Sequence, residues 1–261
     1  ELSEIQEWLS EIQELVKTGR FTIQQHDEDC HTAIESYLTE KYGEVWKKIH
    51  TGRSRNDQSL TMIRLYMKGI YEESIDKIEC LIKTLKKRIW EKDINMPGYT
   101  HAQKAMPTSK NTWLGSFHDA LCEELIMLRP FWKILDQSPL WSAAWFGIRW
   151  FENDRKFSAN EMRFSKVQEN PMYCGISRGL FEYEFLSLIG NFLMILSRLN
   201  NDILLFTTSE FGFLSLPDNM TTGSSIMPQK RNYDVCELVR AKIAIFFGYS
   251  DQMRSEEHTS E

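Results

Sequence analysis

The fold of this chain is restricted first of all by an apolar seam between residues 60 and 89. Apolar side chains recur there alternately four and three residues apart, at Tyr71, Ile75, Ile78, Ile82, Leu85 and Ile89. Together with the apolar residues that precede them from Leu60, they predict a helix of about 33 residues, roughly 50 Å long. A helix of that length with one apolar face must pack against other long helices.

Similar spacing predicts further helices on both sides of this seam. They are expected over residues 1–18, about 32–42, about 114–135, about 178–208 and about 233–247. Met96-Pro97-Gly98 breaks the first long helix, and Pro130 should kink the second. Residues 137–175 show no regular pattern, and alternating strand patterns are nearly absent. The sequence therefore predicts an all-α protein, an elongated bundle of long helices.

Composition narrows the class of protein. Hydrophobic residues make up 42% and charged residues 26% of the 261-residue chain, the balance of an ordinary soluble protein. The formal net charge of -6 argues against a nucleic-acid partner, because phosphate binding needs clustered Lys and Arg. Five widely spaced cysteines without a CxxC pair indicate neither a zinc site nor a disulfide framework. No apolar run approaches the roughly 20 residues of a membrane span, so we expect a cytoplasmic protein without a membrane partner.

The two ends of the chain look cut. It begins at Glu1, without Met and inside a predicted helix, and residues 254–261 resemble the translation of a sequencing adapter. We therefore expect an incomplete N-terminal helical part over 1–95, running into the first long bundle helix. A central bundle region over 96–253, lacking its C-terminal domain, and a non-native tail over 254–261 would follow.

The bundle leaves three polar segments unexplained: His50–Gln58, Gly98–Gln103 and Gly223–Asn232. Each one starts a predicted helix or lies just before one, where free N–H groups and the helix dipole favour carboxylates. Arg53 and Arg55 add donors that could bind a carboxylate in a fork. Helix capping, surface salt bridges or a satisfied histidine would explain any one segment alone. Their joint occurrence at the ends of long helices indicates a functional site.

The third segment has the groups that an elimination next to a carboxylate requires. Such a reaction needs a base at the carbon and donors for the charge that builds up on the carboxylate oxygens. Ser224 and Ser225 offer hydroxyls beside polarising N–H groups, Lys230 offers a cation and Asn232 a neutral donor. The loop around Gly223 could also close over a substrate and exclude water.

These segments resemble a known family. Gly223–Asn232 is similar to the signature loop of the fumarase/aspartase superfamily, all-α homotetrameric lyases that release fumarate. Within it, His50–Gln58, Gly98–Gln103 and Asp27–Thr32 resemble the argininosuccinate lyase family. The resemblance runs over nearly all of residues 1–248. It implies a fumarase/aspartase-like fold and the cleavage of argininosuccinate to arginine and fumarate, with no metal or organic cofactor.

The resemblance also implies a role for particular residues. Ser224 would be the base that takes the Cβ proton of the succinyl part, and His101 the partner acid or a polarising group. The substrate-binding residues that it implies are Ser54, Arg55, Asn56, Thr100, Ser225, Lys230 and Asn232. Each active site of the implied homotetramer would take its three segments from three different subunits.

The chain departs from the family pattern after Ser138-Pro139-Leu140, where the family is rich in glycine. Trp141 and Trp145 stand where glycine is expected, and tryptophan would strain or fill the site if those positions need positive φ. A sequence error is the simplest alternative. Three other readings are a sibling fumarate-releasing lyase, which Arg53–Asn56 argues against, a catalytically inactive relative like the lens crystallins, and a coiled-coil interaction module.

Overall fold

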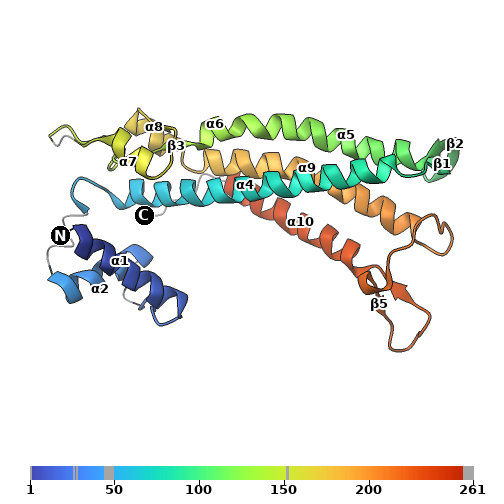
Figure 1. Ribbon diagram of the computed structural model, residues 1–261, viewed down its shortest axis with the longest axis horizontal. Coiled ribbons are helices and arrows are strands. Elements are labelled where there is room, and N and C mark those ends of the chain that lie inside the picture. Colours follow the sequence, from blue (N-terminus) through green and yellow to red (C-terminus); the bar gives the residue numbers. More distant parts are fainter. Residues whose placement is uncertain (1, 26, 28, 44–49, 151–152, 255–261) are drawn as a thin grey trace. The chain divides into compact units, whose positions relative to one another are not determined.

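The computed structural model describes residues 2–25, 27, 29–43, 50–150 and 153–254. Helices dominate the described residues, as the sequence predicts (Figure 1). The helices are α1 (Leu2–Lys17), α2 (Cys30–Tyr42), α4 (Arg55–Trp90), α5 (Lys110–Leu128), α6 (Trp132–Leu135), α7 (Arg155–Glu161), α8 (Pro171–Ile176), α9 (Leu180–Phe206) and α10 (Asp234–Arg254), with 3-10 turns η2 (Arg129–Phe131) and η3 (Asp218–Met220). The strands are β1 (Asn95–Thr100), β2 (Gln103–Ser109), β3 (Gln137–Ser138), β4 (Lys166–Val167), β5 (Thr222–Gly223) and β6 (Arg231–Asn232).

The chain divides into two compact units. The first combines residues 1–63 with 137–176, and the second combines residues 64–136 with the chain from Ser177 onward. Helix α4 begins in the first unit and continues into the second. The boundary expected near residue 95 stays a prediction. Of the tail expected over 254–261, Arg254 is the last residue of α10, and the remainder lies outside the described residues.

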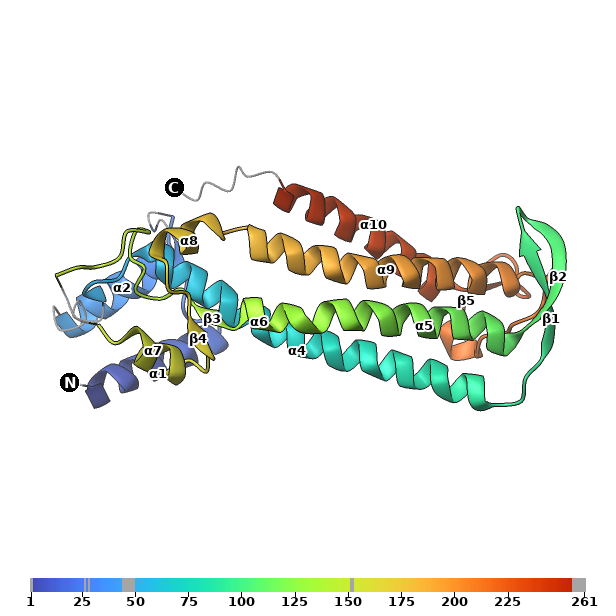
Figure 2. The same cartoon turned by 90° about the horizontal axis from the view of Figure 1, so that it is seen from above.

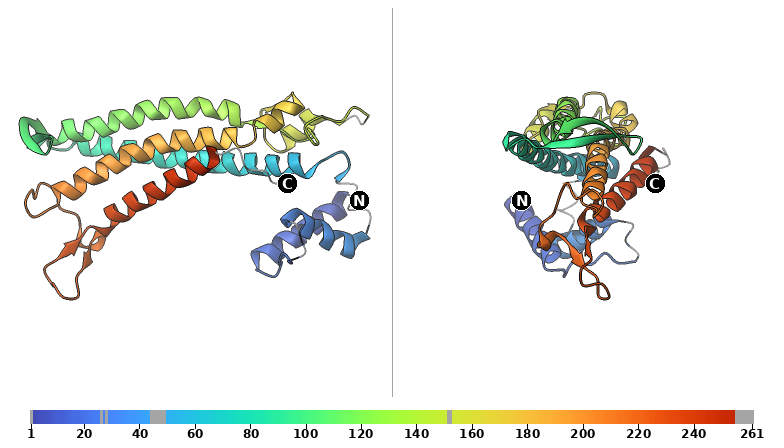
Figure 3. Two further views of the ribbon diagram at one scale, coloured as in Figure 1. Left: turned by 180° about the vertical axis from the view of Figure 1, so that it is seen from behind. Right: turned by 90° about the vertical axis from the view of Figure 1, so that its right-hand side faces the viewer.

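The second unit is the predicted bundle of long helices. Helices α4, α5 and α9 run side by side, and α10 returns antiparallel to α9 (Figures 2 and 3). The seam residues Tyr71 and Leu85 are buried, and Ile75, Ile78 and Ile82 pack against the same core. This core also contains Phe117, Leu121, Leu125 and Leu128 from α5, and Phe181, Phe185, Phe192 and Leu199 from α9. The 36-residue α4 is therefore held by one continuous apolar face.

The second long helix is interrupted at Pro130, as predicted. Helix α5 ends at Leu128, and a 3-10 turn over Arg129–Phe131 leads into α6. Proline lacks the N–H group that the next helical hydrogen bond needs, so the helix tightens at this point. The Tyr71 hydroxyl donates a hydrogen bond to the Arg129 carbonyl at 3.1 Å and fastens the turn to α4.

Helix α9 corrects one expectation from the sequence. By length and composition, Leu180–Phe206 is apolar enough to cross a membrane. In the bundle, however, Phe181, Phe185, Phe192 and Leu199 of this helix are buried against α4 and α5. These four side chains make α9 a core helix of the bundle, although only 22% of its most apolar stretch is buried.

In the first unit, α1 and α2 form a small helical pair. Its core is Ile12 and Leu38. The Glu11 carboxylate accepts a hydrogen bond from the Tyr37 hydroxyl at 2.7 Å and further bonds from Lys41 and Tyr42. The bonds from Lys41, Tyr42 and Tyr37, in that order, lower the pKa of Glu11 from 4.5 to about 2.

Each helix of this pair is followed by a glycine with positive φ. Gly19 follows α1 with φ 68°, and Gly43 follows α2 with φ 75°. Backbone with positive φ is the conformation that glycine adopts at little cost, so these residues end their helices by local chemistry alone.

Candidate active site

The first polar segment forms the start of α4. Arg55 is the first residue of the helix, and Ser54 stands just before it with its N–H donating to the Asp57 carboxylate at 3.0 Å. The Asn56 N–H donates to the Ser54 hydroxyl at 3.3 Å. Ser54, Arg55 and Asn56 are all half-buried. The segment therefore lies at a helix N-terminus, as predicted, and its turn is closed by its own side chains.

Arg55 is positioned by α2. Its guanidinium donates to the Thr32 hydroxyl at 2.9 Å, and its Nε lies 3.4 Å from an Asp29 carboxylate oxygen. Asp29 is also the N-cap of α2, where it accepts the Thr32 N–H at 2.8 Å. The two segments that resemble the argininosuccinate lyase family in this unit are thus joined through one arginine.

The segment after Leu140 has the backbone that the glycine pattern implies. Trp141 has φ 66°, Ala143 φ 52° and Trp145 φ 71°, all in the left-handed region that side chains rarely adopt. Trp145 lies against Gly175, where a Cβ atom would come within 2.8 Å of the indole ring. Trp141 carries the Arg53 guanidinium 5.6 Å from its ring centre, a cation–π contact.

The second segment corrects the expectation that each polar stretch leads into a helix. Gly98–Gln103 belongs to an antiparallel hairpin of β1 and β2, in which Thr100 pairs with Gln103. His101 (φ 51°) and Ala102 (φ 59°) form the turn, and α5 starts only at Lys110. Two successive residues with positive φ are typical of a tight hairpin turn, so strand pairing decides the conformation. Thr100 and His101 are exposed at its tip.

The hairpin is fastened to the bundle at its base. The Asp93 carboxylate accepts the Asn111 N–H at 3.0 Å, the largest of the contacts that lower its pKa. The Lys110 ammonium donates hydrogen bonds to the backbone carbonyls of Arg88 and Lys92, both at 2.9 Å. These bonds join the end of α4 to the start of α5, so the base of the hairpin cannot shift independently of the helices.

An aromatic cluster contacts the hairpin at Tyr99. The Tyr99 ring lies 5.2 Å from Phe211 and 6.5 Å from Phe213, between ring centres. Phe206, at the end of α9, lies 5.5 Å from Phe213 and 5.4 Å from Trp113. Tyr99, two positions before His101, is therefore anchored to the segment that follows α9.

The third segment is a second hairpin, just before α10 as predicted. Thr222 pairs with Asn232 and Gly223 with Arg231, so that residues 224–230 form its loop. Within the loop, the Ser224 hydroxyl oxygen accepts N–H bonds from Ile226 at 3.4 Å and Met227 at 3.2 Å. Donors aimed at a hydroxyl oxygen favour its deprotonated form.

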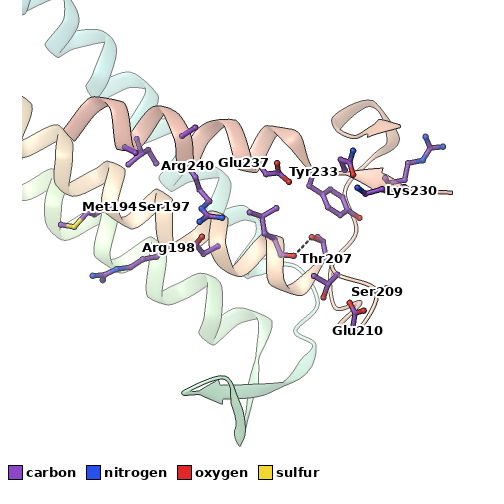
Figure 4. A pocket seen from close by; sticks show the side chains of 18 of the residues that line it. Met194, Ser197, Arg198, Thr207, Ser209, Glu210, Lys230, Tyr233, Glu237 and Arg240 are labelled. Atoms are coloured by element: carbon purple, nitrogen blue, oxygen red, sulfur yellow. Dashed lines mark hydrogen bonds between the residues drawn. The ribbon is translucent and has the colours of Figure 1, made fainter. Parts of the chain in front are cut away.

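The structure brings some of the predicted residues together. Lys230 and Asn232 line a groove of about 1410 Å³ between α9 and α10, together with Arg198, Glu237 and Arg240 (Figure 4). The hairpins of His101 and Ser224 lie at the same end of the bundle (Figures 1 and 2). Neither His101 nor Ser224 lines the groove, and no hydrogen bond or ion pair joins the two hairpins among the described residues.

Sequence reasoning missed two residues that support the candidate site. Asp57 was part of the first segment, but its burial was not foreseen; the spacing Ser54-x-x-Asp57, a capping-box pattern, could have indicated it. Tyr99 has no such local signal, because its aromatic partners come more than 100 residues later. In the described part of the chain, no group of three or more His, Cys, Asp or Glu side chains could hold a metal ion.

The chain is similar in structure to solved lyases, and this similarity defines its class. The chain is similar to EDDS lyase in complex with formate, with a TM-score of 0.82 and 25% identity, covering 93% of this chain and 47% of that one. It shares the fold of a class II fumarase from Schistosoma mansoni, with a TM-score of 0.68 and 19% identity, covering 86% and 55%. The architecture is that of an all-α lyase, as the sequence predicts.

A protein-family model described as Lyase matches residues 1–248, and the chain belongs to this family. Three relatives named argininosuccinate lyase show how similar the sequences are. Thermotoga neapolitana has one that is 47% identical over 246 residues, covering 92% of this chain and 61% of the relative. Xanthomonas campestris pv. campestris has one at 40% over 226 residues (86% and 52%), and Phocaeicola vulgatus one at 38% over 235 residues (90% and 52%). The chain thus spans between about half and three fifths of these relatives.

Proposed function

We propose that the protein containing this chain is an argininosuccinate lyase, which splits argininosuccinate into arginine and fumarate by β-elimination. The observation that carries the proposal is the 47% identity over 246 residues to a relative of that name. The polar segments support it, because two hairpins and one helix start supply the residue types that the reaction needs. As a member of a soluble enzyme family, the protein is expected to act in the cytoplasm.

In the proposed reaction, Ser224 removes the Cβ proton of the succinyl part. The electron pair of that C–H bond forms the double bond of fumarate, and the C–N bond to the arginine guanidine breaks. His101 supplies a proton to the departing nitrogen or polarises the site. A serine alkoxide is a costly base, so the N–H groups of Ile226 and Met227 that Ser224 accepts are an essential part of the proposal.

The remaining predicted residues bind the substrate. The Lys230 ammonium offsets the charge that builds up on the succinyl carboxylate, and Ser225 and Asn232 donate to its oxygens. Thr100 and the segment Ser54–Asn56 hold the rest of the molecule in register with the base. Arg55 acts from a fixed position, because Asp29 and Thr32 hold its guanidinium.

The proposal includes a homotetramer whose active sites are shared between subunits. His101 and Thr100 are exposed at the tip of their hairpin, although a proton donor for this reaction needs a site that excludes water. A neighbouring subunit that covers the tip would supply that environment. On the same reasoning, the 261-residue chain alone is expected to be inactive, since its relatives extend well beyond the matched part.

The test measures fumarate release, by ultraviolet absorbance, from argininosuccinate added to the full-length protein. Ser224→Ala should lower kcat by about 10² to 10⁴-fold, the usual contribution of a general base. Ser215→Ala, a change of an exposed serine in the preceding loop, is the matched control and should leave kcat unchanged.

Two other results would replace the proposal. Fumarate released from adenylosuccinate or aspartate, but not from argininosuccinate, would identify a sibling lyase. A folded protein that releases no fumarate from any of the three would identify a non-catalytic relative, with the positive φ of Trp141 and Trp145 as the first place to look for lost activity.

A further inference from the structure

Asp57 is a fully buried carboxylate within the first polar segment. Its exposed fraction is 0%, although it stands in the first turn of α4, beside half-buried Ser54, Arg55 and Asn56. One carboxylate oxygen accepts the Ser54 N–H at 3.0 Å and so closes the turn that carries Arg55 and Asn56. A buried carboxylate in this place has to be fully hydrogen-bonded, because its desolvation is costly.

The other oxygen of Asp57 reaches a segment 86 residues further along the chain. It accepts the Ala143 N–H at 2.9 Å, and the Trp141 backbone N–H contributes a further hydrogen bond. Both donors come from the stretch in which Trp141, Ala143 and Trp145 have positive φ. In this conformation the backbone N–H groups of Trp141 and Ala143 both point toward the Asp57 carboxylate. The loop therefore binds Asp57 through its main chain.

We propose that Asp57 is a positioning residue, which holds Ser54–Asn56 in their substrate-binding geometry by fastening them to the backbone of residues 141–143. The inference deepens the proposed function and rests on it for the role of Ser54–Asn56. Asp57 itself does not touch the substrate, because its carboxylate oxygens are taken up by backbone donors of its own unit.

The electrostatics agree with this role. Burial raises the pKa of Asp57, whereas the N–H bonds from Ser54, Ala143 and Trp141, and the nearby Arg53 guanidinium, act against that rise. The Arg53 guanidinium lies 5.6 Å from the centre of the Trp141 ring, a cation–π contact that keeps it close. An uncharged amide at position 57 would turn an NH₂ group toward one of the backbone donors and break that link.

The arrangement also explains how tryptophan can replace glycine at position 141. The backbone N–H groups of Trp141 and Ala143 donate hydrogen bonds to Asp57, and the Trp141 ring makes a cation–π contact with Arg53. The backbone strain at Trp141 is offset locally by these contacts, because each holds the residue in its left-handed conformation.

The experiment compares Asp57→Asn with the unsubstituted longer protein. The KM for argininosuccinate should rise about tenfold, with kcat of the folded enzyme within about threefold, because the proton-transfer residues lie on other segments. Hydrogen exchange should speed up at the amides of Ser54 and Ala143 and stay unchanged in α5. If Asp57→Asn does not fold, Asp57→Ser takes its place, since it keeps one acceptor and buries no charge.

Asp154→Asn is the matched control. Asp154 also accepts a backbone N–H, from Phe157 at 2.8 Å, and lies in the same unit at the start of α7. The KM of the Asp154→Asn variant, and hydrogen exchange at its Ser54 and Ala143 amides, should equal those of the unsubstituted protein. A variant at position 57 with unchanged KM and unchanged local exchange overturns the inference.

The two proposals fail in different ways. If the unsubstituted protein releases no fumarate, the proposed function is wrong, while hydrogen exchange still decides whether Asp57 holds the two segments together. If the unsubstituted protein is active and Asp57→Asn keeps its KM, the positioning role alone is wrong.

Discussion

The ion pair of Lys68 and Asp136 allows a quantitative test of the bundle. The Lys68 ammonium lies 2.5 Å from the Asp136 carboxylate, and the two side chains are only 11% and 8% exposed. The ammonium also lies 5.1 Å from the ring centre of Trp132. The pair joins the middle of α4 to the residue that ends α6, just after the kink at Pro130. Its removal should therefore loosen the contact between the two long helices.

The expected magnitude follows from burial. Removing one partner of a buried ion pair leaves an uncompensated charge and costs about 3 to 5 kcal/mol, whereas an exposed pair contributes about 1 kcal/mol or less. Asp136→Ala should therefore lower the free energy of unfolding by about 3 to 5 kcal/mol. Lys68→Met combined with Asp136→Ala removes both charges, so it should cost less than Asp136→Ala alone.

The assay is urea unfolding followed by far-ultraviolet circular dichroism, applied to the unsubstituted protein, both single variants and the double variant. The interaction free energy from this cycle should be at least about 2 kcal/mol. Additive effects of the two substitutions, or a loss below about 1 kcal/mol for Asp136→Ala, would refute the reasoning that burial makes this pair strong.

Two further predictions concern the helical pair and the first hairpin. Because the pKa of Glu11 falls from 4.5 to about 2 in the folded state, its hydrogen-bonded carboxylate stabilises α1 and α2 fully above pH 4.5 and loses this effect as the pH falls toward about 2. The protection factors of the α2 amides, which correct for the pH dependence of intrinsic exchange, should fall over that range, and Glu11→Gln should remove this fall. An equal response in the variant would contradict the prediction. Tyr99→Ala should lower kcat for fumarate release by up to about 100-fold, because the hairpin loses its contacts with Phe211 and Phe213. Tyr99→Phe should keep these contacts and the rate. Equal rates for the two variants would argue against positioning by the ring.

The helical elements follow from the sequence because their signals are local. Apolar residues recur about once per helical turn from Tyr71 to Leu85. Their side chains therefore point to the same face of the helix, whichever element covers that face. Gly19, Gly43 and Pro130 act through their own backbone conformation, so the helix ends and the kink were predictable within a few residues. The identity of the candidate residues likewise came from motifs read along the chain.

How those residues are held depends on contacts between segments that are far apart in the sequence. The hairpin of Thr100 and His101 depends on pairing between Asn95–Thr100 and Gln103–Ser109, strands too exposed to show an alternating pattern of apolar and polar residues. Its anchor, Tyr99, contacts Phe211, which follows α9, so this contact depends on how the helices between them pack. Asp57 finds the Ala143 N–H across 86 residues, and no local spacing encodes a contact of that range, because it forms only when the chain between them has folded back.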